Sequence, residues 1–142
     1  MVIAMVGGRI SEEALAWAEN PEWAEKYGGI DFRPPQSVAD AAARGLEIRN
    51  KVGRGGLSTK EAGKQGIGSG VARASSLKNR QALNPDTIGR MVSFFARHST
   101  FKKNHTTNPP SNSLISWLLW GGDPGRAWAE KVKDQMDKAE EA

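Results

Sequence analysis

The chain has no cysteine among its 142 residues, which excludes disulfide scaffolds, zinc fingers and thiol nucleophiles. Long hydrophobic runs are also missing. The longest is Leu114 to Trp120, interrupted by Ser116, whereas a membrane span needs roughly 20 apolar residues. Met1 to Val6 are apolar, but they are too short for a secretory signal and lack its basic residues. We therefore expect a soluble protein of a reducing cytoplasm, with no membrane partner.

Residues that carry chemistry are few. The two histidines, His98 and His105, have no third ligand at metal-binding spacing, so no metal site is predicted. Motifs typical of serine hydrolases, zinc proteases and nucleotide hydrolases are absent, and the glycine-rich GKQGIGSG follows a predicted helix rather than a strand. Backbone amides near Ser69, at a predicted helix start, are an alternative phosphate site. Otherwise we expect no catalytic residue and no cofactor, and so a protein that is not an enzyme.

Charge is distributed unevenly along the sequence, although the net charge is only +4. Residues 1–36 carry three Lys/Arg against six acids, or −3. Residues 37–103 carry thirteen against four, or +9, and residues 104–142 carry four against six, or −2. Clustered cations attract polyanions such as nucleic acid through counterion release. The alternatives are a solvated basic face, or pairing of the basic middle with the acidic ends of the same chain.

Helix caps and apolar periodicity favour an all-α fold. Ser11 precedes two acids and Asn84 precedes a proline, and both patterns are typical of a helix start. Ile88, Met91 and Phe95 then recur at helical spacing along an amphipathic helix. No segment alternates as a β-strand does for more than four residues. We predict a compact bundle of about six or seven short helices.

The helix expected at residues 113–120 should form the centre of this bundle. Its sequence, SLISWLLW, has large apolar residues on all sides, which indicates burial of every face. The polar segment 98–111 before it contains Asn108-Pro109-Pro110 and is predicted to be a long mobile loop. The end of the C-terminal helix is expected to fray.

Composition changes near residue 36, where Pro34-Pro35 predicts an extended connector. Residues 1–36 are interpreted as an acidic, Trp-bearing N-terminal extension of two short helices, and residues 37–142 as a basic helical domain. Trp23, together with Trp17 and Tyr27, is a candidate docking surface for a protein partner. The five tryptophans could instead be stacking platforms for single-stranded nucleic acid, but core packing is favoured for Trp17, Trp117, Trp120 and Trp128 because they lie among other apolar residues.

The segment 58–79 is similar in pattern to a helix-turn-helix: a predicted helix, a glycine turn and a second predicted helix. The second helix would present Ser69, Arg73, Ser76 and Lys78 to a nucleic-acid groove. Short polar and basic side chains suit contacts to phosphates and base edges. The alternative is an ordinary pair of helices, because a helix, a glycine turn and a helix recur in many helical domains.

Four motifs in order, RGLEIRNKVGRGG, GVARASSLKN, TIGRMVSFFARH and ISWLLWGGDPGRAWAEKV, resemble a small domain of tailed bacteriophages and prophages. That domain occurs alone or appended to head-morphogenesis or prohead-protease-like proteins. The resemblance covers about residues 32–138. It implies a phage or prophage protein, and it implies no catalytic residue. Where relatives have a charged stretch with lysines and glycines, this chain has TFKKNHTTNPPSNS.

Two functions follow as hypotheses for a protein in the host cytoplasm or associated with the virion. The first is a phage or prophage accessory protein that binds nucleic acid through a basic helical face within residues 37–103. The second is a virion or head-assembly module that binds capsid, portal or protease proteins through its N-terminal helices. The first hypothesis requires the cations to gather on one side of the molecule. The residues expected to contact nucleic acid are Arg44, Arg49, Lys51, Arg54, Lys60, Lys64, Ser69, Arg73, Lys78, Arg80, Arg90, Arg97, Lys102 and Lys103.

Overall fold

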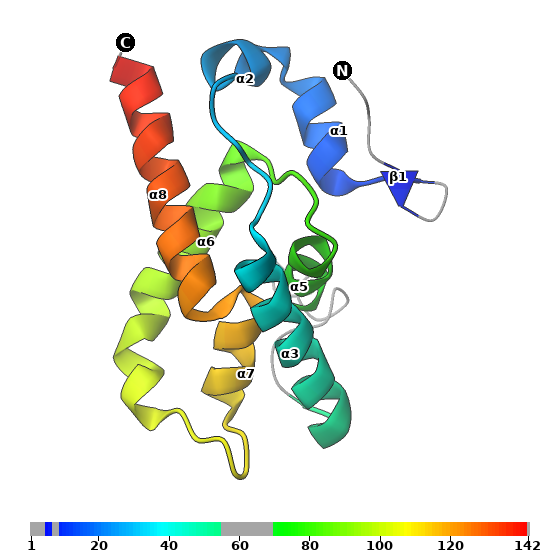
Figure 1. Cartoon of the computed structure of the whole chain (residues 1–142), viewed down its shortest axis with the longest axis vertical. Coiled ribbons are helices and arrows are strands. Elements are labelled where there is room, and N and C mark those ends of the chain that lie inside the picture. The colour runs from blue at the N-terminus through cyan, green and yellow to red at the C-terminus, as the bar shows by residue number, and fades with distance from the viewer. Residues whose placement is uncertain (1–4, 7–8, 55–69, 142) are drawn as a thin grey trace.

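The computed structural model describes residues 5–6, 9–54 and 70–141, and this part of the chain forms seven α-helices and one 3-10 helix (Figure 1). A two-residue antiparallel strand pair, β1 with β2, precedes the helices. The all-α prediction is confirmed. The elements are β1 (Met5–Val6), β2 (Arg9–Ile10), α1 (Glu12–Glu19), α2 (Pro21–Lys26), α3 (Gln36–Val52), α5 (Gly70–Lys78), α6 (Pro85–His98), η1 (Ser99–Asn104), α7 (Asn112–Leu119) and α8 (Gly122–Glu141).

Most helices begin where the sequence predicts. The Ser11 hydroxyl accepts a hydrogen bond from the Ala14 amide at 3.1 Å and caps α1, and Asn84 caps α6 through the Thr87 amide at 3.0 Å. The α3 helix begins at Gln36, directly after the predicted Pro34-Pro35 connector, with Pro35 at its cap position. Proline at this position needs no hydrogen-bond partner for its nitrogen.

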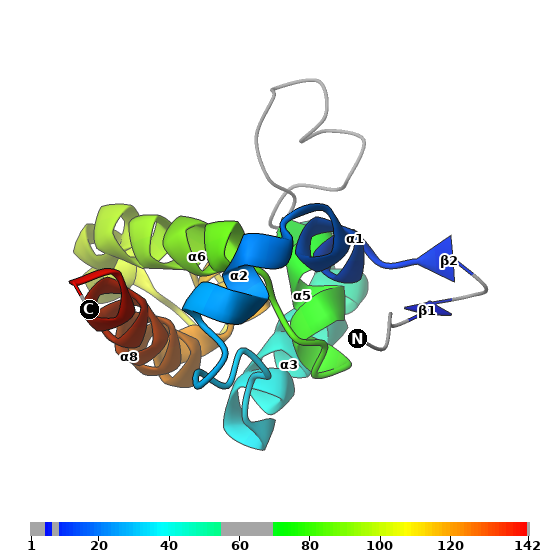
Figure 2. The ribbon, with the colours of Figure 1, turned by 90° about the horizontal axis from the view of Figure 1, so that it is seen from above.

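The α7 helix lies at the centre of the bundle, as predicted, and contacts α3, α5, α6, α8 and η1. Ile115, Trp117 and Leu119 on this helix are buried. Figure 1 shows α7 between α3 on one side and α6 with α8 on the other, and Figure 2 shows α5 beside α3. Close packing of α3 on α7 depends on Gly45, because a Cβ there would come within 2.8 Å of the Leu119 backbone nitrogen.

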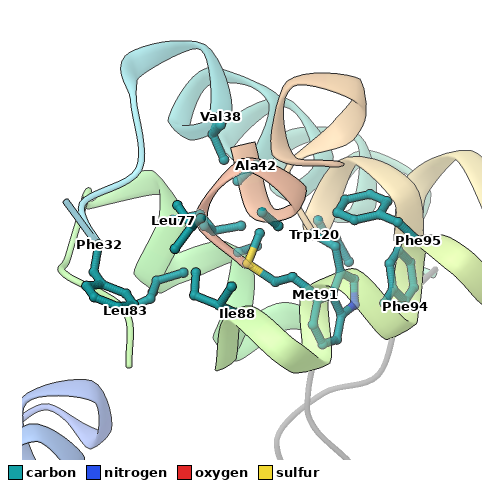
Figure 3. Close-up of a cluster of buried hydrophobic side chains, with 14 of the residues drawn as sticks. Phe32, Val38, Ala42, Leu77, Leu83, Ile88, Met91, Phe94, Phe95 and Trp120 are labelled. Carbon is teal, nitrogen blue, oxygen red and sulfur yellow. The ribbon is translucent and has the colours of Figure 1, made fainter. Parts of the chain in front are cut away.

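The described part of the N-terminal extension packs into the same core as the rest of the chain. Tyr27 and Phe32 belong to the buried cluster that also contains Leu83, Met91 and Trp120, and Figure 3 shows Phe32 beside Leu83. The backbone amide of Leu83 donates to the Phe32 carbonyl at 2.9 Å. The change in composition near residue 36 therefore does not separate two cores.

The predicted loop 98–111 is more regular than expected. Residues 99–104 form η1, and the turn after it is closed by an isolated bridge between Thr107 and Pro110. The Thr106 hydroxyl donates to the Pro109 carbonyl at 2.7 Å. Short polar side chains commonly organise a turn through such local bonds to the backbone. The segment lacks apolar periodicity, so the sequence alone did not indicate η1.

The C-terminal helix α8 continues to Glu141, and fraying of its end stays a prediction. Its last turn is tied to the end of α2: Tyr27 Oη donates to Glu140 Oε1 at 2.6 Å. None of the helices in the described ranges combines the length and apolarity needed to cross a membrane.

Candidate nucleic-acid interface

Among the described cations, Arg80 and Arg54 lie at opposite ends of α3, so the predicted residues do not all share one face. Arg80 Nε donates to the Pro34 carbonyl at 2.9 Å, directly before α3 begins. Arg54, just beyond the other end of α3, donates to the Pro110 carbonyl at 2.9 Å. The 17 residues of α3 span about 25 Å. Arg80 and its neighbour Lys78 are thus separated from the cations at the C-terminal end of α3.

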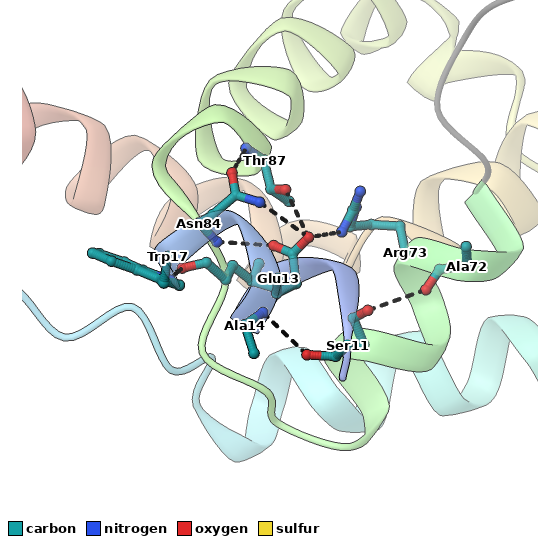
Figure 4. A network of polar contacts seen from close by, with 10 residues as sticks. Ser11, Glu13, Ala14, Trp17, Ala72, Arg73, Asn84 and Thr87 are labelled. Carbon is teal, nitrogen blue, oxygen red and sulfur yellow. Dashed lines mark hydrogen bonds and ion pairs between the residues drawn. The ribbon is translucent and has the colours of Figure 1, made fainter. Parts of the chain in front are cut away.

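Arg73 is buried, and the prediction that it faces a nucleic-acid groove is wrong. Its side chain is only 7% exposed, and Nη1 lies 3.3 Å from Glu13 Oε2. The guanidinium also lies 5.9 Å from the ring centre of Trp120. Figure 4 shows the Glu13 carboxylate at the centre of this network, where it also accepts bonds from the Asn84 amide at 2.8 Å and the Thr87 hydroxyl at 3.1 Å. The network joins α1, α5 and α6 and has a structural role.

The first half of the predicted helix-turn-helix lies outside the described residues, and the second half is α5. Lys60, Lys64 and Ser69, together with the first predicted helix, lie outside the described residues. On α5, Ala74 and Leu77 are buried with Arg73, and Ser76 donates back to the Ala72 carbonyl at 3.3 Å. Lys78 is the one exposed cation of this helix. The described residues therefore do not support α5 as a recognition helix.

A second set of cations lies along α6 and η1. Arg90 and Arg97 are exposed and stand seven residues apart, which places them on the same side of α6 about 10 Å from one another. Lys103 on η1 is exposed too. Within the described ranges, none of these three side chains forms an ion pair with an acid. Their charges are therefore available to an anionic partner.

Lys102 is held differently from its neighbour Lys103. Its Nζ lies 2.9 Å from Asp123 Oδ1 and 5.6 Å from the ring centre of Trp117. The same carboxylate oxygen accepts a 2.9 Å bond from Trp117 Nε1. The hydrogen bond from Lys102, helped by the bond from Trp117, lowers the pKa of Asp123. These contacts attach η1 to the start of α8.

The C-terminal half of α3 brings further positive charge to the same end of the molecule. Arg44 and Lys51 are exposed and Arg49 is half-buried, while Lys51 lies 3.6 Å from Glu47. Arg54 also donates to the Asn112 side chain at the start of α7. Figure 1 shows the end of α3 and the segment after α6 at the same end of the bundle. We call this region the basic end, which comprises Arg49, Lys51, Arg54, Arg97, Lys102 and Lys103.

Most cations of α8 are paired with acids in the described chain, unlike Arg97 and Lys103 of the basic end. Three of its four cations pair with acids one turn away on the same helix: Arg126 with Glu130, Lys133 with Asp137, and Lys138 with Asp134. In each such pair the charge of the cation is offset by the charge of the neighbouring acid. The exposed cations without an acid partner in the described chain therefore include Arg90, Arg97 and Lys103 on α6 and η1, whereas α8 has most of its cations paired.

An aromatic column leads from the core to the basic end. The Trp120 and Phe94 rings stack at 4.7 Å, Phe94 and His98 stack at 4.3 Å, and His98 lies 5.9 Å from Phe101. Phe101, on η1, is 49% exposed. Burial, with a smaller effect of Arg97, lowers the pKa of His98, which favours the neutral form of this imidazole. Phe101 was not among the residues predicted from the sequence, although an aromatic residue followed by two lysines was a usable signal.

The proposed docking trio on α1 and α2 is only partly at the surface. Tyr27 is 5% exposed, so its assignment to a docking surface is wrong. Trp17 and Trp23 are half-buried and pack edge to face at 5.7 Å, and Trp17 packs in the same way on Phe32 at 4.9 Å. Trp17 Nε1 also donates to the Leu83 carbonyl at 2.9 Å. Leu15, which is 43% exposed, is the more prominent apolar side chain on α1.

The described residues contain no group of three or more His, Asp or Glu side chains that could hold a metal ion. Comparison with known proteins does not assign the chain to a family: no family model, no curated protein and no solved structure matches it.

Proposed function

We propose that this protein binds nucleic acid through the basic end, as a non-enzymatic accessory protein of a phage or prophage. The proposal is carried by a difference in ion pairing between the cations of α6 and η1 and those of α8. Arg97 and Lys103 are exposed without an acid partner in the described chain, whereas most cations of α8 are neutralised within their own helix. Lys and Arg side chains that contact phosphates displace the cations condensed on the nucleic acid. The release of these counterions is the main source of sequence-independent affinity.

The proposed interface is narrower than the face expected from the sequence. It excludes Arg73, which is buried, and it excludes Lys78 and Arg80, which lie at the far end of α3. Arg90 lies on the same side of α6 as Arg97, so nucleic acid that contacts Arg97 could also contact Arg90 further along the helix. Phosphate contacts position a protein without reading sequence, so we expect little base preference from these cations.

The test is fluorescence anisotropy of labelled random nucleic acid at two salt concentrations. Affinity should fall steeply as salt rises. Arg97→Ala and Lys103→Ala should each reduce the salt slope by about one. Lys131→Ala is the matched control, because Lys131 is an exposed cation on α8 without an ion pair in the described chain. Equal losses in the control, or no binding at low salt, would contradict the proposal.

The second candidate function is a head-assembly module that docks through the N-terminal helices. Exposed Leu15 and half-buried Trp23 favour it, because apolar side chains at a surface commonly mark protein contacts. Co-purification of the intact protein with capsid, portal and protease proteins tests this function. Leu15→Ser should abolish the association and leave nucleic-acid binding unchanged.

A further inference from the structure

We propose that the nucleic acid bound at the basic end is single-stranded and that one of its bases stacks on Phe101. The inference rests on the proposed function and specifies its substrate class. It starts from an exposed ring, since Phe101 and Leu15 are the large hydrophobic side chains that are exposed in the described chain. Of these two, only Phe101 lies among cations.

The Phe101 ring lies next to His98, at the outer end of the aromatic column. His98 lies 5.9 Å from it and is itself stacked on Phe94, which is 5% exposed. The backbone around it is held as well: the Ser99 hydroxyl donates to the Ala96 carbonyl at 3.1 Å, and the His105 amide donates to the Lys102 carbonyl at 3.1 Å. A ring held in this way loses little conformational freedom when a ligand covers it, which favours binding.

Cations flank the ring on both sides in sequence. Arg97 comes four residues before Phe101 and Lys103 two residues after it, and both are exposed. The rise of a 3-10 helix places Lys103 about 4 Å further along the axis than Phe101. Lys102, between them in sequence, is paired with Asp123. Proteins that bind single strands combine an aromatic stacking platform with cations that follow the backbone.

A single strand fits this arrangement better than a duplex. The faces of bases in a duplex are covered by their neighbours, so an exposed ring can stack only on an unpaired base. Duplex readout commonly uses a helix with polar and basic side chains toward a groove. The helix expected to do this, α5, buries Arg73 against Glu13 instead.

A protein partner fits less well at the same place. The centre of a protein interface is depleted of charge around its aromatic anchors. Here Arg97 and Lys103 lie within a few residues of the ring and carry the same sign of charge. This charge pattern complements a phosphate backbone.

The test compares an oligodeoxythymidylate of about 20 nucleotides with a duplex of the same length at one salt concentration. The wild-type protein should prefer the single strand. Phe101→Ala should weaken single-strand binding about 5- to 150-fold and leave duplex binding unchanged. Phe101→Trp should restore single-strand binding, because it keeps a stacking face, whereas Phe101→Leu should not. Circular dichroism of each variant checks that the helices are intact.

The outcomes separate this inference from the proposed function. If the duplex binds as tightly as the single strand and Phe101→Ala changes neither affinity, the inference is wrong while nucleic-acid binding stands. Loss of both affinities in Arg97→Ala, without an effect of Phe101→Ala, likewise overturns the stacking inference alone. If neither nucleic acid binds at low salt, both proposals fail.

Discussion

Tyr27 Oη donates a 2.6 Å hydrogen bond to Glu140 Oε1, across 113 residues of sequence. The same carboxylate oxygen lies 3.8 Å from Lys26 Nζ. The contact joins the end of α2 to the last turn of α8, so the second helix and the last helix stabilise one another. An exposed carboxylate near the chain end thereby gains a structural role.

The first prediction concerns the ionisation of Tyr27, the only tyrosine of the chain. Burial, followed by the hydrogen bond to Glu140, raises its pKa from 10.0 to about 12. Because the folded-state pKa is raised, this contribution to stability is fully present below pH 10 and is lost as the pH rises toward 12. Ultraviolet absorbance of tyrosinate measures the titration directly.

Glu140→Gln provides the control for this titration. It removes the negative charge but not the burial, so the tyrosine pKa should fall partway toward its ordinary value. Tyrosinate that forms near pH 10.0 in the folded wild-type protein would show that Tyr27 is neither buried nor bonded as described.

The second prediction concerns the buried carboxylate of Glu13. Glu13→Ala leaves the Arg73 guanidinium and the Asn84 amide without their acceptor, and it should lower the free energy of unfolding by about 3–5 kcal/mol. Glu13→Gln keeps one acceptor oxygen and should cost less. Urea unfolding measures both. The neighbouring Glu12 is exposed, and Glu12→Ala should cost at most about 1 kcal/mol; equal losses at the two positions would refute the network's importance.

The third prediction compares two helical glycines. A Cβ at Gly45 would lie 2.8 Å from the Leu119 nitrogen and 3.0 Å from the Leu118 carbonyl carbon, both backbone atoms, whereas a Cβ at Gly89 would meet nothing within 4 Å. Gly45→Ala should therefore destabilise the protein by about 1–3 kcal/mol. Gly89→Ala should stabilise it by about 0.5–1 kcal/mol, since alanine favours the helix. Thermal unfolding gives both signs, and a stabilising Gly45→Ala would disprove close packing of α3 on α7.

The fourth prediction concerns Lys102 and the strength of nucleic-acid binding. Asp123→Asn removes the acid that holds the Lys102 ammonium at 2.9 Å but keeps an acceptor for Trp117 Nε1. The released cation should tighten binding by up to about fivefold. The salt slope should steepen by about 0.7 to 0.9. Anisotropy at several salt concentrations measures both changes, and weaker binding in this variant would place the nucleic acid away from η1.

Several features of the fold follow from the sequence because they depend on residues close together in the chain. Ser11 and Asn84 cap helices through amides three residues away. The apolar segment 113–120 forms a central helix that buries Ile115, Trp117 and Leu119. Leu114 and Leu118 are only half-buried, so the expected burial of every face is wrong. The absence of cysteine and the presence of only two histidines were equally visible in the composition.

The candidate site was only partly predictable. Arg97 and Lys103 were expected to be exposed and are exposed. Phe101 was not singled out: the two lysines after it were a usable signal, but without apolar periodicity the segment does not show whether the ring is buried or exposed. The sequence also did not show where the cations lie in space. Arg54 and Arg80 bond to backbone carbonyls at opposite ends of α3, and no local pattern in the sequence distinguishes them.

The sequence by itself determined the helical class, the central helix and the excess of positive charge between residues 37 and 103. Only the tertiary structure decided which of those charges face solvent. Arg73 is buried because Glu13, 60 residues earlier, folds back to neutralise it. Helix capping and amphipathic periodicity depend on residues within one or two turns, so the sequence shows them directly. Whether a charged side chain is buried or exposed depends on residues far away in the sequence that it contacts only after folding.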